Sequence, residues 1–105
     1  MIKRLSLIRR NEGMTPQAFW EHYTGPHAAI VHKMPGLRKM LLSRVVGPHA
    51  CVWDAVGELW FDDAAAAEHA FADPEIADLL ALDRPLFLGQ SEVVFVEETT
   101  CWPAD

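Results

Sequence analysis

The stretch DAVGELWFDDAAAAEHAFADPEI, residues 54–76, decides the fold because a strand, a stop and a helix follow one another in it. Side chains of a strand alternate between the two faces of a sheet. One face of the predicted strand over 54–61 carries Ala55, Gly57, Leu59 and Phe61, and the other carries Val56, Glu58 and Trp60. Asp62 and Asp63 then cap a helix over 64–72, because carboxylates accept the free N–H groups of a first turn.

The two faces of this strand have different predicted environments. The small residues Ala55 and Gly57 leave room for a helix or a ligand, so we assign their face to a pocket. Glu58 and Trp60 then point toward a dimer partner. A buried Glu58 needs a positive partner, for which we expect Arg38 or Arg44 on the neighbouring strand.

The rest of the chain completes a βαββαβ order. Strands are predicted over 2–9, 37–46 and 89–98, a helix from Thr15 to Met34, and a short helical segment over 75–82. Thr15 is a suitable N-cap and Pro16 a suitable first helical residue. The order predicts an α+β fold, ferredoxin-like, with a four-stranded antiparallel sheet and helices on one face, whose other face needs a partner sheet. Residues 1–105 form one domain, with 99–105 as a flexible or partner-contacting tail.

Charge is distributed unevenly along the 105 residues, whose net charge is −6. Residues 1–44 carry eight Lys/Arg and two acids, whereas residues 45–105 carry one basic residue and thirteen acids. Opposite charges facing one another across strands help to set register. The first strand is therefore predicted beside the last, with Lys3, Arg9 or Arg10 facing Glu92, Glu97 or Glu98. Basic residues engaged in this way argue against a nucleic-acid partner.

Apolar runs and cysteines bear on the compartment. No apolar run is long enough to span a bilayer, and the first ten residues do not resemble a secretory signal. We therefore expect no membrane partner and a cytoplasmic location, in which Cys51 and Cys101 stay reduced.

Three histidines stand five residues apart in EHYTGPHAAIVH, residues 21–32. A spacing of five turns an α-helix by about 140°, so His22, His27 and His32 are not expected to share a metal ion. The same geometry places His27 within the apolar face, and His22 and His32 on the solvent side. Two interpretations of His27 remain open: a core histidine bonded to a carbonyl or water, or a titratable group that faces a pocket.

A family resemblance favours the second interpretation. The resemblance rests on three stretches, MTPQAFWEHYTGPHAAIVHKMPGLRKM (14–40), residues 54–76 and GQSEVVFVEE (89–98). Together they resemble the EthD family of dimeric α+β barrel proteins. The resemblance implies a homodimer in which two sheets pack together, with a pocket in each subunit between its sheet and its helices. His27, followed eight residues later by Pro35 and Gly36, matches the histidine of the family.

The chemistry implied by resemblance has several forms. DAVGE and WF resemble methylmuconolactone isomerases, which use a pocket histidine and cysteines on a lactone, but Leu59 stands where their cysteine is expected. Other members of the superfamily are cofactor-free monooxygenases or polyketide cyclases. Such reactions need an apolar site, a base and donors that hold an enolate or phenolate. The predicted catalytic residue is His27, and the predicted substrate-binding residues are Trp20, Tyr23, Leu59, Phe61 and Phe87; for each aromatic, plain core packing is the alternative.

The predicted function is a cofactor-independent enzyme that applies acid/base chemistry to a small aromatic, lactone or polyketide-like substrate, as an isomerase, cyclase or monooxygenase. One alternative is a non-catalytic carrier of a small hydrophobic ligand, or an accessory protein of an oxygenase or degradation pathway. Another is a purely structural dimer without a cavity. No metal and no cofactor are expected.

Overall fold

The computed structural model describes residues 1–47 and 51–103, and it has the predicted βαββαβ order. The sequence GPHACVW, residues 47–53, predicts a loop, but its His49 lies outside the described residues. The elements are β1 (Ile2–Arg10), α1 (Pro16–His22), the π-helical turn η1 (Tyr23–His27), α2 (Ala28–Val31), β2 (Lys39–Arg44), β3 (Ala55–Phe61), α3 (Ala64–Ala72), α4 (Pro74–Phe87) and β4 (Leu88–Glu97).

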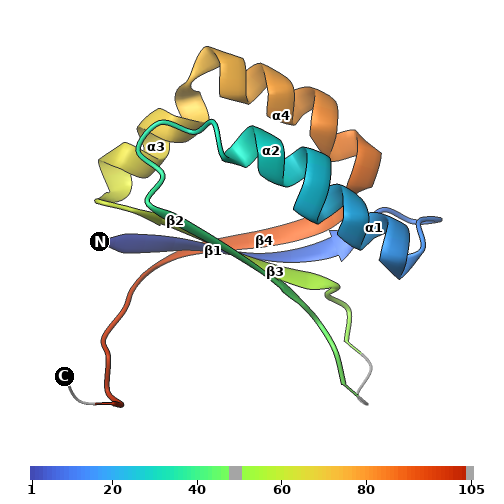
Figure 1. The fold of residues 1–105 in the computed structure, drawn as a ribbon, viewed down its shortest axis with the longest axis horizontal. Coiled ribbons are helices and arrows are strands. Elements are labelled where there is room, and N and C mark those ends of the chain that lie inside the picture. Colours follow the sequence, from blue (N-terminus) through green and yellow to red (C-terminus); the bar gives the residue numbers. More distant parts are fainter. Residues whose placement is uncertain (48–50, 104–105) are drawn as a thin grey trace.

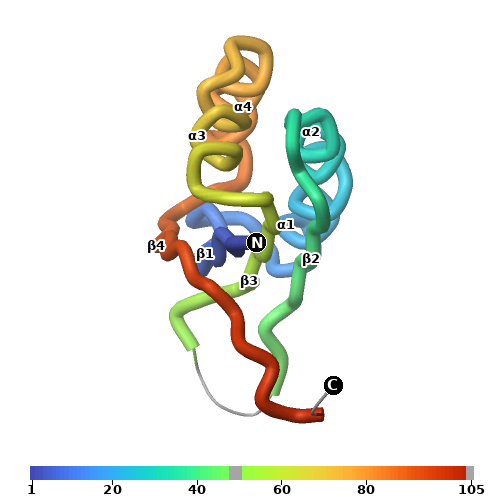
Figure 2. The backbone as a smooth tube through the Cα atoms, turned by 90° about the vertical axis from the view of Figure 1, so that its left-hand side faces the viewer, coloured from blue at the N-terminus to red at the C-terminus, as the bar shows by residue number. Residues whose placement is uncertain are grey.

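The four strands form one antiparallel sheet in the order β2-β3-β1-β4. The helices all lie on one face of this sheet, and no helix of residues 1–47 and 51–103 covers the other, which we call the bare face (Figure 1). Seen from the end, α1 and α2 form one column over the sheet and α3 and α4 form a second (Figure 2). The predicted α+β, ferredoxin-like fold with its four-stranded sheet is therefore confirmed. No helix in the described part of the chain combines the length and apolar character that a bilayer crossing requires.

The first helical segment is divided into three parts. Thr15 caps α1 as predicted, because its Oγ1 accepts the Ala18 N–H at 3.1 Å. A proline inside a helix lacks the N–H that would continue the hydrogen-bond ladder. Pro26 lies within η1, where the helix widens for one turn before α2 resumes the α-helical form.

The last helix is longer than the sequence indicated. We predicted helical structure over 75–82, but α4 continues through Pro85 to Phe87. Its last carbonyl groups are satisfied from the β1–α1 loop, since Asn11 N donates to Phe87 O at 2.7 Å and Asn11 Nδ2 donates to Pro85 O at 3.0 Å. These two bonds satisfy carbonyl groups that the C-terminal end of a helix leaves without intrahelical partners.

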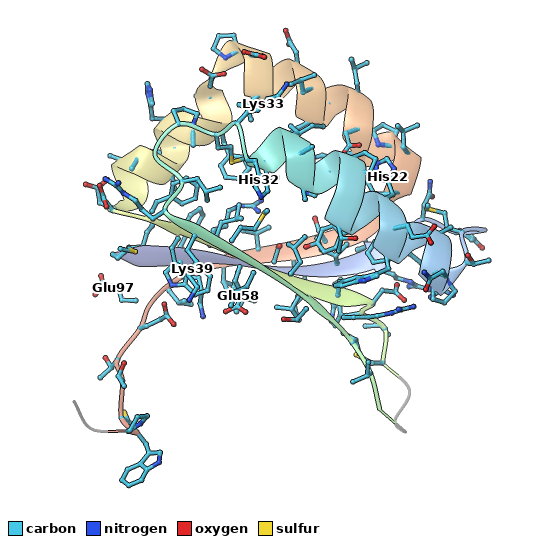
Figure 3. All side chains as sticks on the ribbon, in the orientation of Figure 1. His22, His32, Lys33, Lys39, Glu58 and Glu97 are labelled. Atoms are coloured by element: carbon cyan, nitrogen blue, oxygen red, sulfur yellow. The ribbon has the colours of Figure 1, made fainter. Side chains whose placement is uncertain are left out.

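The strand predictions hold for β3 and its faces. Ala55, Gly57, Leu59 and Phe61 are buried under the helices, whereas Glu58 projects from the opposite face (Figure 3). The expected partner of Glu58 is wrong. Lys3 Nζ lies 2.7 Å from Glu58 Oε2, because β1 and β2 both border β3 and Lys3 is the closer cation.

The two arginines that we expected at Glu58 have other partners. Arg38 pairs with Asp62, and Arg44 donates to Gln17. The predicted pairing of the first and last strands is confirmed, and Lys3 also reaches Glu98 at 3.3 Å.

Candidate active site

A cavity of about 320 Å³ lies between the sheet and the helices. Its apolar wall is formed from both layers, by Val31, Met34, Leu59 and Leu80 among others. Its polar wall contains Arg4, Ser6, Tyr23, His27 and Arg84. A concave, mostly apolar site with a few polar groups is the usual form of a small-molecule site.

Three side chains beside this cavity form a hydrogen-bonded cluster. Asp83 on α4 contacts His27 Nδ1 through Oδ2 at 2.8 Å and His22 Nε2 through Oδ1 at 2.6 Å. The Asp83 side chain is 6% exposed, and the two imidazoles are 16% and 19% exposed. Because a carboxylate accepts hydrogen bonds, Nδ1 of His27 is the donor and its Nε2 is left as the basic nitrogen.

The π-helical turn explains why two histidines five residues apart meet one carboxylate. In an α-helix they would be rotated apart by about 140°. A π-helix instead bonds residue i to residue i+5, so side chains five apart point in similar directions, and such turns are frequent at functional sites. His22 was predicted to face solvent, which is wrong, because it lies against α4 (Figure 3). His32 is exposed, as predicted.

Burial changes the acidity of two side chains in the site. It lowers the pKa of His27 from its ordinary value of 6.5, although the Asp83 hydrogen bond opposes the effect. Burial also raises the pKa of Tyr23 to about 12, against the smaller effects of the Ser6 hydroxyl and the Arg4 charge. At neutral pH the site therefore offers a neutral imidazole as a base and a protonated phenol as a donor.

Gly57 makes space for that phenol. A Cβ atom at this position would overlap the Tyr23 hydroxyl, and it would lie 2.8 Å from Ser6 Oγ. Real Cβ atoms essentially never approach other atoms so closely. The glycine in the centre of β3 is therefore required by the close approach of the Tyr23 side chain.

The structure places four of the six predicted site residues on the cavity. Tyr23, His27, Leu59 and Phe87 line it. Trp20 is not among the lining residues; it packs on Tyr23 at a ring distance of 6.1 Å. Phe61 is also absent from the lining and lies in the core against Phe71, so both positions are packing residues in this structure.

Neither of the two cysteines lines the cavity. Cys51 lies away from the cavity, in a separate polar depression that Arg10 and Asp54 also line. Cys51 and Cys101 are both free and exposed. Among the described residues, no group of three or more His, Cys, Asp or Glu side chains has an arrangement suited to a metal ion.

Asp83 is the main residue that the sequence analysis missed. The sequence does contain a pattern that includes this aspartate. The 4-3-4 spacing of one helix face is followed by four residues that are all buried in the structure, Ile76, Leu80, Asp83 and Phe87. An aspartate at such a position needs a partner inside the protein. The prediction of a helix ending at residue 82 left this acid outside the pattern.

The fold and the site together define a ferredoxin-like α+β domain in which a cavity-lining histidine contacts a buried aspartate. The model of the EthD domain matches residues 11–91, and the chain belongs to this family. It is similar to a crystal structure of an EthD family protein from Bacillus halodurans, with 30% identity, a TM-score of 0.79 and coverage of 94% of this chain and 99% of that one.

Two further relatives extend the comparison. An uncharacterized 11.0 kDa protein from the thcB–thcC intergenic region of Rhodococcus erythropolis is 28% identical over 96 residues, which cover 89% of this chain and 92% of the relative. SnoaB, a cofactor-independent oxygenase from Streptomyces nogalater, is 17% identical with a TM-score of 0.71, covering 98% of this chain and 97% of its own. At that identity the likeness concerns the fold.

Proposed function

We propose that this protein is a cytosolic, cofactor-independent enzyme that removes a proton from a small aromatic or polyketide-like substrate, with His27 as the base. The observation that carries the proposal is the 2.8 Å contact between His27 Nδ1 and the buried Asp83 carboxylate, at the wall of a 320 Å³ cavity. A positioned acid/base group is worth about 10² to 10⁴ in rate.

Each side chain has one task in this mechanism. Asp83 holds the imidazole in the tautomer whose Nε2 carries the lone pair, and it stabilises the imidazolium that forms. Nε2 takes the proton of an acidic C–H or O–H bond, and the electron pair of that bond remains on the substrate as an enolate or phenolate. The Tyr23 hydroxyl is suited to donate a hydrogen bond to that oxygen, since it stays protonated at neutral pH. Return of the proton to another carbon completes an isomerisation.

The cavity also bears on the reaction type. Leu59 lines it at the position where the resemblance to methylmuconolactone isomerases implies a thiol, which disfavours a cysteine-assisted lactone reaction. Its apolar wall suits a ring system. SnoaB, which shares the fold, is described as a cofactor-independent oxygenase, and this supports chemistry without a bound cofactor for the present chain.

The proposal is tested by hydrogen–deuterium exchange at an acidic C–H bond. β-Tetralone, an enolisable bicyclic ketone small enough for the cavity, is incubated with the protein in D₂O and followed by NMR. The wild type is expected to accelerate exchange, and His27→Gln to abolish the acceleration. His32→Gln is the matched control, because His32 is an exposed histidine of the same helical segment.

The carrier hypothesis has a distinct outcome in this experiment. A protein that only binds small ligands would give exchange no faster than buffer, or equal exchange in wild type and His27→Gln. Either result contradicts the enzyme proposal.

We also propose that a second copy of the chain covers the bare face of the sheet. This face exposes apolar side chains, including Leu41 at 45% and Val94 at 52%. On this face the strand register places Leu5 beside Val94 and Glu58 beside Leu41. The Lys3–Glu58 ion pair lies on the same face. Large exposed apolar areas on a sheet mark an interface. Light scattering is expected to give twice the 11.8 kDa chain mass, whereas a stable monomer at micromolar concentration would contradict the proposal.

The C-terminal tail belongs to the same proposal. It leaves β4 and projects from the side of the sheet opposite the helices (Figure 1). Trp102 in this segment is 87% exposed. We assign the tail to contact with the second copy.

A further inference from the structure

Two arginines line the cavity without a carboxylate partner. Arg4 enters from β1, and Arg84 enters from α4, one residue after Asp83. Within residues 1–47 and 51–103, neither guanidinium takes part in an ion pair or a side-chain hydrogen bond. Asp83 is not a hydrogen-bond partner of either arginine, because both of its carboxylate oxygens contact histidines.

The two charges act on one another and on the base. Arg4 is partly buried, with its guanidinium 4.4 Å from the centre of the Phe71 ring. Burial lowers the pKa of Arg4, and repulsion from Arg84 lowers it further. Arg84 also contributes to the lowered pKa of His27, so it lies within electrostatic range of both groups. A partly buried cation beside a second cation is unfavourable until an anion neutralises the pair.

The remainder of the cavity defines the kind of anion. Met34, Leu59 and Leu80 offer an apolar wall, which suits a hydrocarbon ring and not a small inorganic ion. Guanidinium groups match the planar geometry of a carboxylate and bind it through paired hydrogen bonds.

We infer that the cavity binds an organic acid, with its carboxylate held by Arg4 and Arg84, its ring against the apolar wall, and its reacting carbon turned toward His27. The inference rests on the proposed function, since it names the substrate class of that site. In this arrangement the two arginines orient the substrate and also favour the negative charge that develops when His27 removes a proton.

The test compares two ligands of nearly the same shape, of which only one is charged. Binding of α-naphthoate and of its uncharged counterpart α-naphthamide is measured by calorimetry at neutral pH. The wild type is expected to bind the acid at least about tenfold more tightly than the amide, since charge-assisted hydrogen bonds are about twice as strong as neutral ones. Equal affinity for the two ligands, or tighter binding of the amide, would overturn the inference.

Variants then locate the source of the preference. Arg4→Met/Arg84→Gln is expected to remove the preference. Arg84→Gln alone is expected to remove most of it, and this substitution changes an exposed residue of α4 and none of the sheet. Arg9→Gln/Lys33→Gln is the charge-matched control, because both residues are exposed and neither lines the cavity. Retention of the preference in both arginine variants would refute the inference.

His27→Gln separates this inference from the proposed function. The variant is expected to keep the preference for the acid, because its arginines are unchanged. If the preference is present but β-tetralone exchange does not depend on His27, the anion site stands and the enzyme proposal fails. If exchange depends on His27 and the acid shows no preference, the anion site fails and the enzyme proposal stands.

Discussion

Replacement of Asp83 by asparagine tests the cluster on which the site depends. The side chain is 6% exposed and makes two hydrogen bonds to imidazoles, at 2.6 and 2.8 Å. A hydrogen bond to a charged group contributes about 1.5–3 kcal/mol and a neutral one about 0.5–1.5 kcal/mol. Asparagine has the same shape but no charge, so two weakened bonds predict a loss of about 2–3 kcal/mol in the free energy of unfolding.

The assay is chemical denaturation at pH 7.5 and at one fixed protein concentration, so that the variants are compared under the same conditions of association. Asp78→Asn is the control, since Asp78 is an exposed aspartate of the same helix. It is expected to change stability by less than about 0.5 kcal/mol. If Asp83→Asn is as harmless as the control, the carboxylate does not hold the two histidines and the proposed catalytic geometry is wrong.

The remaining predictions concern pH, packing and assembly. Because burial lowers the pKa of His27, its neutral form persists below pH 6.5, and the activity should decline only below that pH. The free energy of unfolding should also fall as the pH drops from 6.5 toward the lowered pKa, and this dependence should be absent in His27→Gln. Gly57→Ala forces a methyl group against Tyr23 and is expected to cost about 1–3 kcal/mol in denaturation, whereas Gly25→Ala, which meets open space, should change stability by less than about 1 kcal/mol. Val94→Arg, which adds a charge to the bare sheet face, should convert a dimer to monomers in sedimentation experiments; an unchanged dimer would place the interface elsewhere.

Much of the fold was predictable because its signals are local. Thr15 and Asp63 are followed by helices whose first N–H groups they accept, and such caps depend on residues only three positions away. The alternation over 55–61 likewise assigns each side chain of β3 to a face without knowledge of its neighbours. Periodicity placed His27 on the apolar face of its helix, and the family resemblance favoured a pocket there over a core position.

The missed features depend on contacts distant in sequence or on non-standard helical geometry. The end of α4 is held by Asn11, 74 residues before Pro85, so no local pattern indicates that this helix reaches Phe87. The helical wheel assumed 100° per residue across Gly25 and Pro26, where the chain forms a π-helical turn instead. These two errors together concealed the contact between His22 and Asp83.

The central claim is that His27 is a neutral base, held by Asp83, with Nε2 available to a ligand in the cavity. Nitrogen-15 NMR of the imidazole rings tests it most directly, because the shifts of the two ring nitrogens report which one carries the proton. At pH 7 we expect His27 to be protonated at Nδ1 only, with its pKa below the ordinary value of 6.5 because of burial, and we expect added α-naphthoate to shift the Nε2 signal of His27. A His27 ring that carries its proton on Nε2, or is doubly protonated at pH 7, would contradict the account.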